Sequence, residues 1–283
     1  MNTAATASTA RQWTLDTDAD RVAWLTFDKP GASANSLSRA AMEELDERLR
    51  ETERQRPAGL VIRSGKSGFI AGADVSEFGQ VREPSAAVPS IRAAHGVLQR
   101  LADLPFPTVA AINGYCLGGG LELAMACRHR VCADDPKVTL GLPEVMLGIH
   151  PGFGGTVRAV QLMGVATAMD LMLTGKILRP DKALQAGLID EIVPAGQLRN
   201  AAKALARRPP AGCGGAAPRT RTATPRRDPY AGDGSAADHP RTARRDAASA
   251  VGGDCSSRIK RSASRRSKSR RAPQERAAAS TSS

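Results

Sequence analysis

The sequence predicts an α/β fold in which layers of sheet are stacked and helices lie outside them. Segments rich in Val, Ile and aromatic residues alternate along the chain with segments of helical period, and this alternation is the first observation. The second is a glycine-rich loop that recurs between a strand-like segment and the next helix-like one, as in INGYCLGGGLE. Because helix N-termini carry unpaired amides, each such loop can hold an anion or a developing oxyanion.

In the first half of the chain the hydrophobic period separates strands from helices. One expected helix has a single apolar face, formed by Met42, Leu45 and Leu49. The segment AGLVIRSG is apolar through its centre, which is typical of a buried strand, and it leads into the small-residue loop FIAGADVSEF. The expected elements are, in order, a hairpin of two strands (12–16 and 21–28), a helix (38–54), a strand (58–65), a helix (86–101) and a strand (107–114).

In the second half of the chain the expected helices are shorter and follow glycine or proline. A strand is expected where GLIDEIVP follows the last of the glycine-bounded helices. The expected elements are, in order, a helix beginning in GGGLELAMAC, short strands around Val131 and Val138, a helix beginning near Gly155, helices over 166–173 and 180–186, a strand over 187–194 and a helix ending near Ala206.

The composition changes sharply at Arg207. The segment 207–283 contains 18 Lys and Arg against 6 Asp and Glu, an excess equal to the net charge of +12 of the whole chain, so residues 1–206 are neutral. The segment also lacks Leu, Met, Phe and Trp, and so cannot bury enough surface to offset the entropy of ordering. We therefore expect a folded domain over residues 1–206 and a disordered basic tail over residues 207–283.

The cysteines and the chain start indicate where the protein works. Five cysteines form no C-x-x-C pair and no metal-like spacing, which favours a reducing compartment. The N-terminal segment lacks a basic start followed by an apolar run, and no segment reaches the roughly 18 apolar residues of a membrane span. These features predict a soluble cytoplasmic protein without a membrane partner.

Several familiar motifs fail on inspection. GKSGF resembles the end of a phosphate loop, but position 60 is Leu where that loop needs glycine. The GGG run lacks the third glycine of a dinucleotide fingerprint, because position 123 is Leu, so no NAD site is predicted. The four histidines have no carboxylate or cysteine partners at ligand spacing, so no metal site is expected.

Three motifs remain: AGAD at residues 71–74, the GGGLE run, and the PE pair that contains Glu144. In this order they resemble the crotonase superfamily, whose best-known members are the enoyl-CoA hydratases and isomerases of fatty-acid β-oxidation. The resemblance covers about residues 13–203 and implies a (ββα)n spiral of stacked sheets with outer helices. The segment LGLPEVMLGIHPGFGGTVR is most similar to the N-terminal hydratase module of the multifunctional fatty-acid oxidation subunits.

The resemblance implies a role for two backbone amides. In the family the thioester oxygen is held by the N–H groups at the positions of Ala73 and Gly119. Preorganised amides stabilise the enolate that forms when water or a proton adds next to a thioester, and the loss of one such donor typically costs about 3 to 4 kcal/mol. The helix that begins at Gly119 turns the positive end of its dipole toward the same oxygen. Taken alone, the three glycines are equally well explained by close packing of a strand against a helix.

The same resemblance implies an acid and a base. Glu122 would position and deprotonate the attacking water, and Glu144 would protonate the α-carbon or relay a proton during isomerisation. Two carboxylates that share a partly dry pocket push their pKa values apart. Each glutamate alone has a structural explanation, because Glu is common in a first helical turn and after a proline that starts a helix. Their combination with the amide loops favours catalysis.

The remaining substrate contacts are expected along the same two loops. The backbone of residues 71–74 would contact the CoA portion, with Ala71, Gly72 and Asp74, and Gly118 precedes the oxyanion glycine. Residues 151–155 would line the acyl side with Pro151 and Gly152, although a tight turn explains these residues equally well. Asp74 can also simply cap the next helix, so no chemistry is assigned to it.

The presence of both glutamates favours hydration, because monofunctional isomerases of this family generally keep the second acid and lack the first. The sequence therefore predicts an enoyl-CoA hydratase with isomerisation as a second activity. CoA enters as part of the substrate, and no separate cofactor is expected. The expected partners are the acyl-CoA substrate and either copies of the same chain or a thiolase subunit.

The basic tail departs from the family pattern, and two explanations compete. Its bias toward Arg, Ala, Pro, Gly and Ser is what a GC-rich gene gives when read out of frame, which would make the chain an inactive truncated fragment of a multifunctional enzyme. Alternatively, RIKRSASRRSKSRR could serve as a nucleic-acid-binding arm. The tail offers few aromatic residues to stack on bases, so binding to nucleic acid is the weaker expectation.

Overall fold

The computed structural model describes residues 11–80 and 84–208. Strands β2 (Val22–Phe27), β3 (Gly59–Ser64), β4 (Thr108–Ile112), β6 (His129–Asp134) and β9 (Glu191–Pro194) form a parallel sheet, and β1 (Trp13–Thr17) pairs antiparallel with β2 at its edge. The expected N-terminal hairpin is thus confirmed. The tail over 209–283, with both explanations offered for it, lies outside the described residues.

A second, smaller sheet stacks beside the first. It consists of β5 (Cys116–Leu117), β7 (Leu140–Gly141) and β8 (Ile177–Leu178). An isolated bridge between Ile70 and Cys116 joins its edge to the loop that follows β3. The prediction of stacked sheet layers is therefore confirmed, although the two-residue strands β5 and β8 were not expected.

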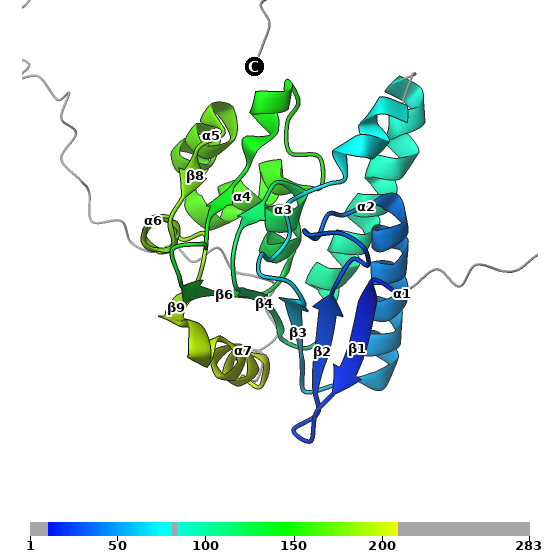
Figure 1. The fold of residues 1–283 in the computed structure, drawn as a ribbon, viewed down its shortest axis with the longest axis vertical. Helices are drawn as coiled ribbons and strands as arrows, with labels where there is room; N and C mark the ends of the chain where they lie inside the picture. Colours follow the sequence, from blue (N-terminus) through cyan, green and yellow to red (C-terminus); the bar gives the residue numbers. More distant parts are fainter. Residues whose placement is uncertain (1–10, 81–83, 209–283) are drawn as a thin grey trace, which may run out of the picture. The chain divides into compact units, whose positions relative to one another are not determined.

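The helices cover both faces of the large sheet (Figure 1). Residues on alternate positions of each strand point to opposite faces, so Leu60 and Ile62 pack with α1, α2 and α3, whereas Val61 packs under α7. The helices are α1 (Arg39–Gln55), α2 (Pro84–Asp103), α3 (Gly119–Ala126), α4 (Gly155–Met163), α5 (Val165–Thr174), α6 (Pro180–Ala186) and α7 (Leu198–Ala206), with 3-10 turns η1 (Val75–Gln80), η2 (Pro143–Leu147) and η3 (Ala195–Gln197).

Local sequence accounts for the way these helices begin. The Ser38 hydroxyl accepts a hydrogen bond from the Ala41 amide at 3.2 Å, which satisfies one of the free amides at the start of α1. The predicted apolar face of α1 is buried, with Leu45 and Leu49 fully inaccessible. No helix among the described residues is both long enough and apolar enough to cross a membrane.

The parallel sheet brings two distant loops together at one edge. The carboxyl ends of β3 and β4 point the same way, so the loops that follow them lie side by side. The Leu117 amide donates to the Ile70 carbonyl at 3.0 Å, and this bond fastens the AGAD loop to the segment before α3. The edge therefore holds both predicted oxyanion residues.

Candidate active site

The backbone around Ala73 is held in an unusual conformation. Gly72 has φ +126°, which strongly favours glycine, and its carbonyl accepts from the Leu37 amide at 2.8 Å. The Ala71 amide donates to the Asn35 carbonyl at 2.8 Å, while the side chain of Asn35 is itself completely buried. The loop is thereby fixed on both sides of the peptide that carries the Ala73 amide.

Gly119 lies directly against this loop. A β-carbon added to Gly119 would be 3.3 Å from the Ala73 nitrogen, and one added to Gly72 would be 3.8 Å from the Gly119 nitrogen. Within residues 11–80 and 84–208, neither the Ala73 amide nor the Gly119 amide donates a hydrogen bond to another group. Gly119 is also the first residue of α3, so the helix dipole adds to the attraction for an anion. Two unpaired donors thus stand next to each other.

Glu122 is buried one helical turn later, with 2% of its surface exposed. Its Oε1 accepts from the amides of Phe153 and Gly155, both at 2.7 Å. Burial raises the pKa of Glu122, while these two N–H donors act in the opposite direction. The sequence predicts that this carboxylate points toward the two oxyanion amides. The structure adds that its Oε1 is bound by amides at the start of α4.

Glu144 lies in η2 and is 9% exposed. Its Oε1 would be 3.0 Å from a β-carbon on Gly118, so the two residues are in contact. Its Oε2 is buried and has no hydrogen-bond partner among the described residues. Burial, reinforced by the negative charge of Glu122, raises the pKa of Glu144 to about 7. A carboxyl group that titrates near neutrality can give or take a proton.

The two glutamates interact electrostatically, with Glu144 against Gly118 and Glu122 against Gly155. Gly118, with φ +49°, leaves the room that Glu144 occupies. Burial disfavours the charged form of both carboxylates. Two amides from another segment favour that form in Glu122, whereas Glu144 is helped by its own backbone amide. The arrangement suits Glu122 as the base and Glu144 as the acid.

The structure places the other predicted contacts around this centre. Asp74 binds Lys29 at 2.7 Å and accepts from the Ser76 amide at 3.2 Å at the start of η1, which is the capping contact expected for it. Gly152 turns its carbonyl toward Nε2 of His95 at 2.6 Å. Pro151 is buried, and its β-carbon would be 3.1 Å from a β-carbon added to Gly155.

Two neighbours of this centre, His95 and Arg158, were not predicted to lie at the site, and Phe153 was included only within the range 151–155 that was expected to line the acyl side. The Arg158 guanidinium donates to the Phe153 carbonyl at 3.1 Å and lies on the far side of the loop that holds Glu122. The contacts of His95 with Gly152 and of Phe153 with Glu122 join residues far apart in the chain, whereas Arg158 contacts Phe153 five residues before it. Only the unusual aromatic within PGFGG offered a signal, since its neighbours are all small.

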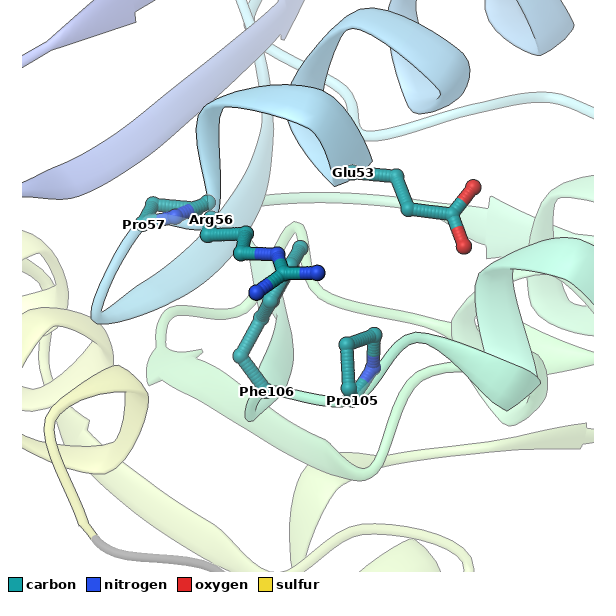
Figure 2. A pocket seen from close by; sticks show the side chains of 5 residues that line it. All are labelled: Glu53, Arg56, Pro57, Pro105 and Phe106. Carbon is teal, nitrogen blue, oxygen red and sulfur yellow. The ribbon is translucent and has the colours of Figure 1, made fainter.

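A surface hollow elsewhere does not coincide with the predicted chemistry (Figure 2). It is lined by Glu53, Arg56, Pro57, Pro105 and Phe106. These residues precede β3 and β4, whereas the glutamates and amides follow those strands, so the hollow lies at the opposite edge of the sheet. Within the described part of the chain, no three His, Cys, Asp or Glu side chains are grouped to hold a metal ion.

Comparisons with known proteins agree on this region. The family described as enoyl-CoA hydratase/isomerase matches residues 17–211. The chain is 48% identical over 190 residues to the fatty acid oxidation complex subunit alpha of Aliivibrio fischeri, and 46% identical over 191 residues to that of Shewanella frigidimarina. These matches cover 66% and 67% of the chain but only 27% of each relative, so the chain spans about a quarter of their length.

Solved structures show the same fold. The enoyl-CoA hydratase of Bacillus anthracis has a TM-score of 0.64 at 32% identity, covering 69% of this chain and 75% of the other. The enoyl-CoA hydratase of Thermoplasma volcanium has a TM-score of 0.65 at 26% identity, covering 70% of this chain and 78% of the other. The predicted fold class is confirmed.

Proposed function

Because the chain belongs to the enoyl-CoA hydratase/isomerase family, we propose that it adds water to trans-2-enoyl-CoA thioesters in fatty-acid β-oxidation. One observation carries this proposal. Two buried glutamates with different hydrogen-bond surroundings stand beside two adjacent amides that have no other acceptor among the described residues. The glutamates can transfer protons next to a carbonyl, and the amides can stabilise the negative charge on its oxygen.

The proposed reaction assigns one task to each group. Glu122 removes a proton from water as the water oxygen bonds to the β-carbon, and the electron pair of the double bond moves toward the thioester oxygen. The amides of Ala73 and Gly119 hold that oxygen while it is negative. Glu144 then gives its proton to the α-carbon, which leaves a 3-hydroxyacyl-CoA. The starting state returns when Glu122 passes its proton to solvent and Glu144 takes a proton from solvent.

Isomerisation is proposed as a second activity of the same centre. Moving a double bond from C3 to C2 needs a proton taken from the α-carbon and returned to the γ-carbon, with no water added. Glu144 can serve as that relay because its pKa lies near neutrality. The amides supply the same enolate stabilisation in both reactions.

The proposed chemistry requires no cofactor besides the CoA portion of the substrate. Carbonyl activation is assigned to the backbone amides, and both proton transfers are assigned to glutamates. The backbone of residues 71–74 is proposed to contact the CoA portion. Pro151 and Gly152 are proposed to line the acyl side. We also propose a cytoplasmic location, which the free cysteines Cys116, Cys127 and Cys132 support.

We propose that the module works in an assembly, either of like chains or with a thiolase subunit. An apolar surface on η2 and α5 supports this, with Met146 75% and Leu173 64% exposed. Exposed apolar side chains gathered on adjacent elements are typical of surfaces that another chain covers. The relatives are subunits of a fatty acid oxidation complex by name, so a role as the hydratase part of such a complex is likewise a proposal.

The test is the loss of the conjugated thioester absorbance when the protein is mixed with crotonyl-CoA. The control is the Glu122→Gln, Glu144→Gln double variant, purified in the same way and checked for the same circular dichroism spectrum. Turnover by the wild-type chain well above that of the control supports the proposal. A wild-type chain as inert as the control would instead indicate a catalytically inactive fragment.

A further inference from the structure

The loop that holds Glu122 also places an aromatic ring beside the oxyanion amides. We propose that the side chain of Phe153 determines which enoyl thioesters the site accepts, favouring those without a branch at the two alkene carbons. The inference rests on the proposed hydratase function and extends it to the class of substrate.

The position of the ring follows from contacts with Gly119. Ring atoms Cδ2 and Cε2 of Phe153 would each be 3.1 Å from a β-carbon added to Gly119, and the Ala73 nitrogen would be 3.3 Å from the same point. The ring edge and both oxyanion residues therefore border one small volume. Phe153 is half-buried and packs against the main hydrophobic core, which limits the orientations of its ring.

The backbone of Phe153 is fastened on both sides. Its amide donates to Oε1 of Glu122 at 2.7 Å, and its carbonyl accepts from Nη1 of Arg158 at 3.1 Å. The preceding carbonyl, that of Gly152, contacts His95 at 2.6 Å. These bonds restrain the backbone of Phe153, so a substrate that pushed on the ring could be accommodated only by a change of its side-chain torsions or by loss of the hydrogen bond to Glu122.

The proposed reaction puts the alkene carbons next to this ring. The thioester oxygen is assigned to the Ala73 and Gly119 amides, and the β-carbon must face the water that Glu122 activates. The Phe153 ring contacts Gly119, and the amide of the same residue contacts Glu122, so the residue borders both points. A methyl group on C2 or C3 would compete with the ring for that space. One methyl group in a closely fitting pocket typically changes kcat/KM by about tenfold or more.

The experiment compares kcat/KM for crotonyl-CoA, trans-2-methylbut-2-enoyl-CoA and 3-methylbut-2-enoyl-CoA in wild-type protein, Phe153→Leu and Phe153→Ala. The matched control is Phe106→Leu, the same substitution of a buried phenylalanine in the hollow at the opposite edge of the sheet. We expect the branched-to-unbranched ratio to rise by about tenfold in both Phe153 variants and to stay at the wild-type value in Phe106→Leu. An unchanged ratio in Phe153 variants that still hydrate crotonyl-CoA would overturn the inference.

A binding measurement separates this inference from the hydratase proposal. Dissociation constants of butyryl-CoA and 2-methylbutyryl-CoA are measured by calorimetry, which needs no turnover. Wild-type protein is expected to prefer the unbranched thioester, and Phe153→Leu to reduce that preference by about tenfold. If the wild-type chain hydrates nothing but shows this shift, the hydratase proposal fails and the role of the ring stands. Equal preference in the two proteins overturns the role of the ring.

Discussion

Glu122 and Glu144 are both buried, yet their carboxylates have opposite surroundings. Glu122 lies in a region rich in donors, where two amides at the start of α4 bind its Oε1. For Glu144 the favourable donor is its own backbone amide, and its Oε2 has no partner among the residues that the structure describes. The difference shows how one short stretch of chain can keep one carboxylate ready to be ionised and the other ready to hold a proton.

The largest effect is expected when the donor-poor carboxylate is removed. Glu144→Gln should lower both hydration of crotonyl-CoA and isomerisation of a 3-enoyl-CoA by about 10³-fold, because hydration needs a proton delivered to the α-carbon and isomerisation needs one removed from it. Steady-state absorbance assays measure both rates. Retention of either activity within tenfold of wild type would show that another group transfers the proton at the α-carbon in that reaction.

Removing the donor-rich carboxylate should separate the two reactions. Glu122→Gln is expected to lower hydration by about 100-fold or more, since activation of water is lost, and to spare isomerisation within about tenfold. Gln can still accept from the amides of Phe153 and Gly155, so the loop should keep its position. Parallel loss of both activities would contradict a role for Glu122 that is confined to water.

The comparison also predicts a pH dependence of stability. The pKa of Glu144 is raised from its ordinary value of 4.5 to about 7, so between these values the folded chain binds more protons than the unfolded chain. Stability should therefore fall as the pH rises from about 4.5 to 7, by about 3 kcal/mol from this residue. Urea titrations at pH 5 and 8 should show a decline smaller by this amount in Glu144→Gln. An identical decline in both proteins would mean that Glu144 is not desolvated in solution.

A third carboxylate near the site provides the smallest effect. Asp74 has its oxygens satisfied by Lys29, Ser36 and Ser76, and the contacts with Lys29 and Ser76 hold the pKa of Asp74 well below its usual range. Because Asp74 and Lys29 are partly exposed, Asp74→Ala should lower the free energy of unfolding by only about 1 kcal/mol. Denaturant unfolding measures it, with Lys29→Ala as the companion variant. A loss above 3 kcal/mol would show that the AGAD loop depends on this carboxylate.

Much of the fold and part of the site could be predicted from local sequence. The N-cap at Ser38, the apolar face of α1 and the helix beginning at Gly119 follow from residues within one or two turns of each other. Strands β5 and β8 are two residues long and have no period that a sequence could display. Glu144 was considered for a helix start after proline, and it lies in the short 3-10 turn η2.

The hydrogen bonds around the glutamates could not be predicted in the same way. The contacts of Glu122 with Phe153 and Gly155 span 31 and 33 residues and exist only once α4 has docked on α3. The orphaned oxygen of Glu144 depends on how η2 closes over Gly118. The catalytic roles of Ala73, Gly119 and both glutamates stay predictions until activity is measured.

The bond between Glu122 and the first amide of α4 has a consequence for the order in which the chain folds. Gly155 is the first residue of α4, so its amide has no acceptor within the helix, and Glu122 of α3 supplies one. Glu122 therefore acquires this hydrogen bond in the same step in which α4 docks on α3. During refolding, hydratase activity should return together with hydrogen-exchange protection of the Gly155 amide, and not before it.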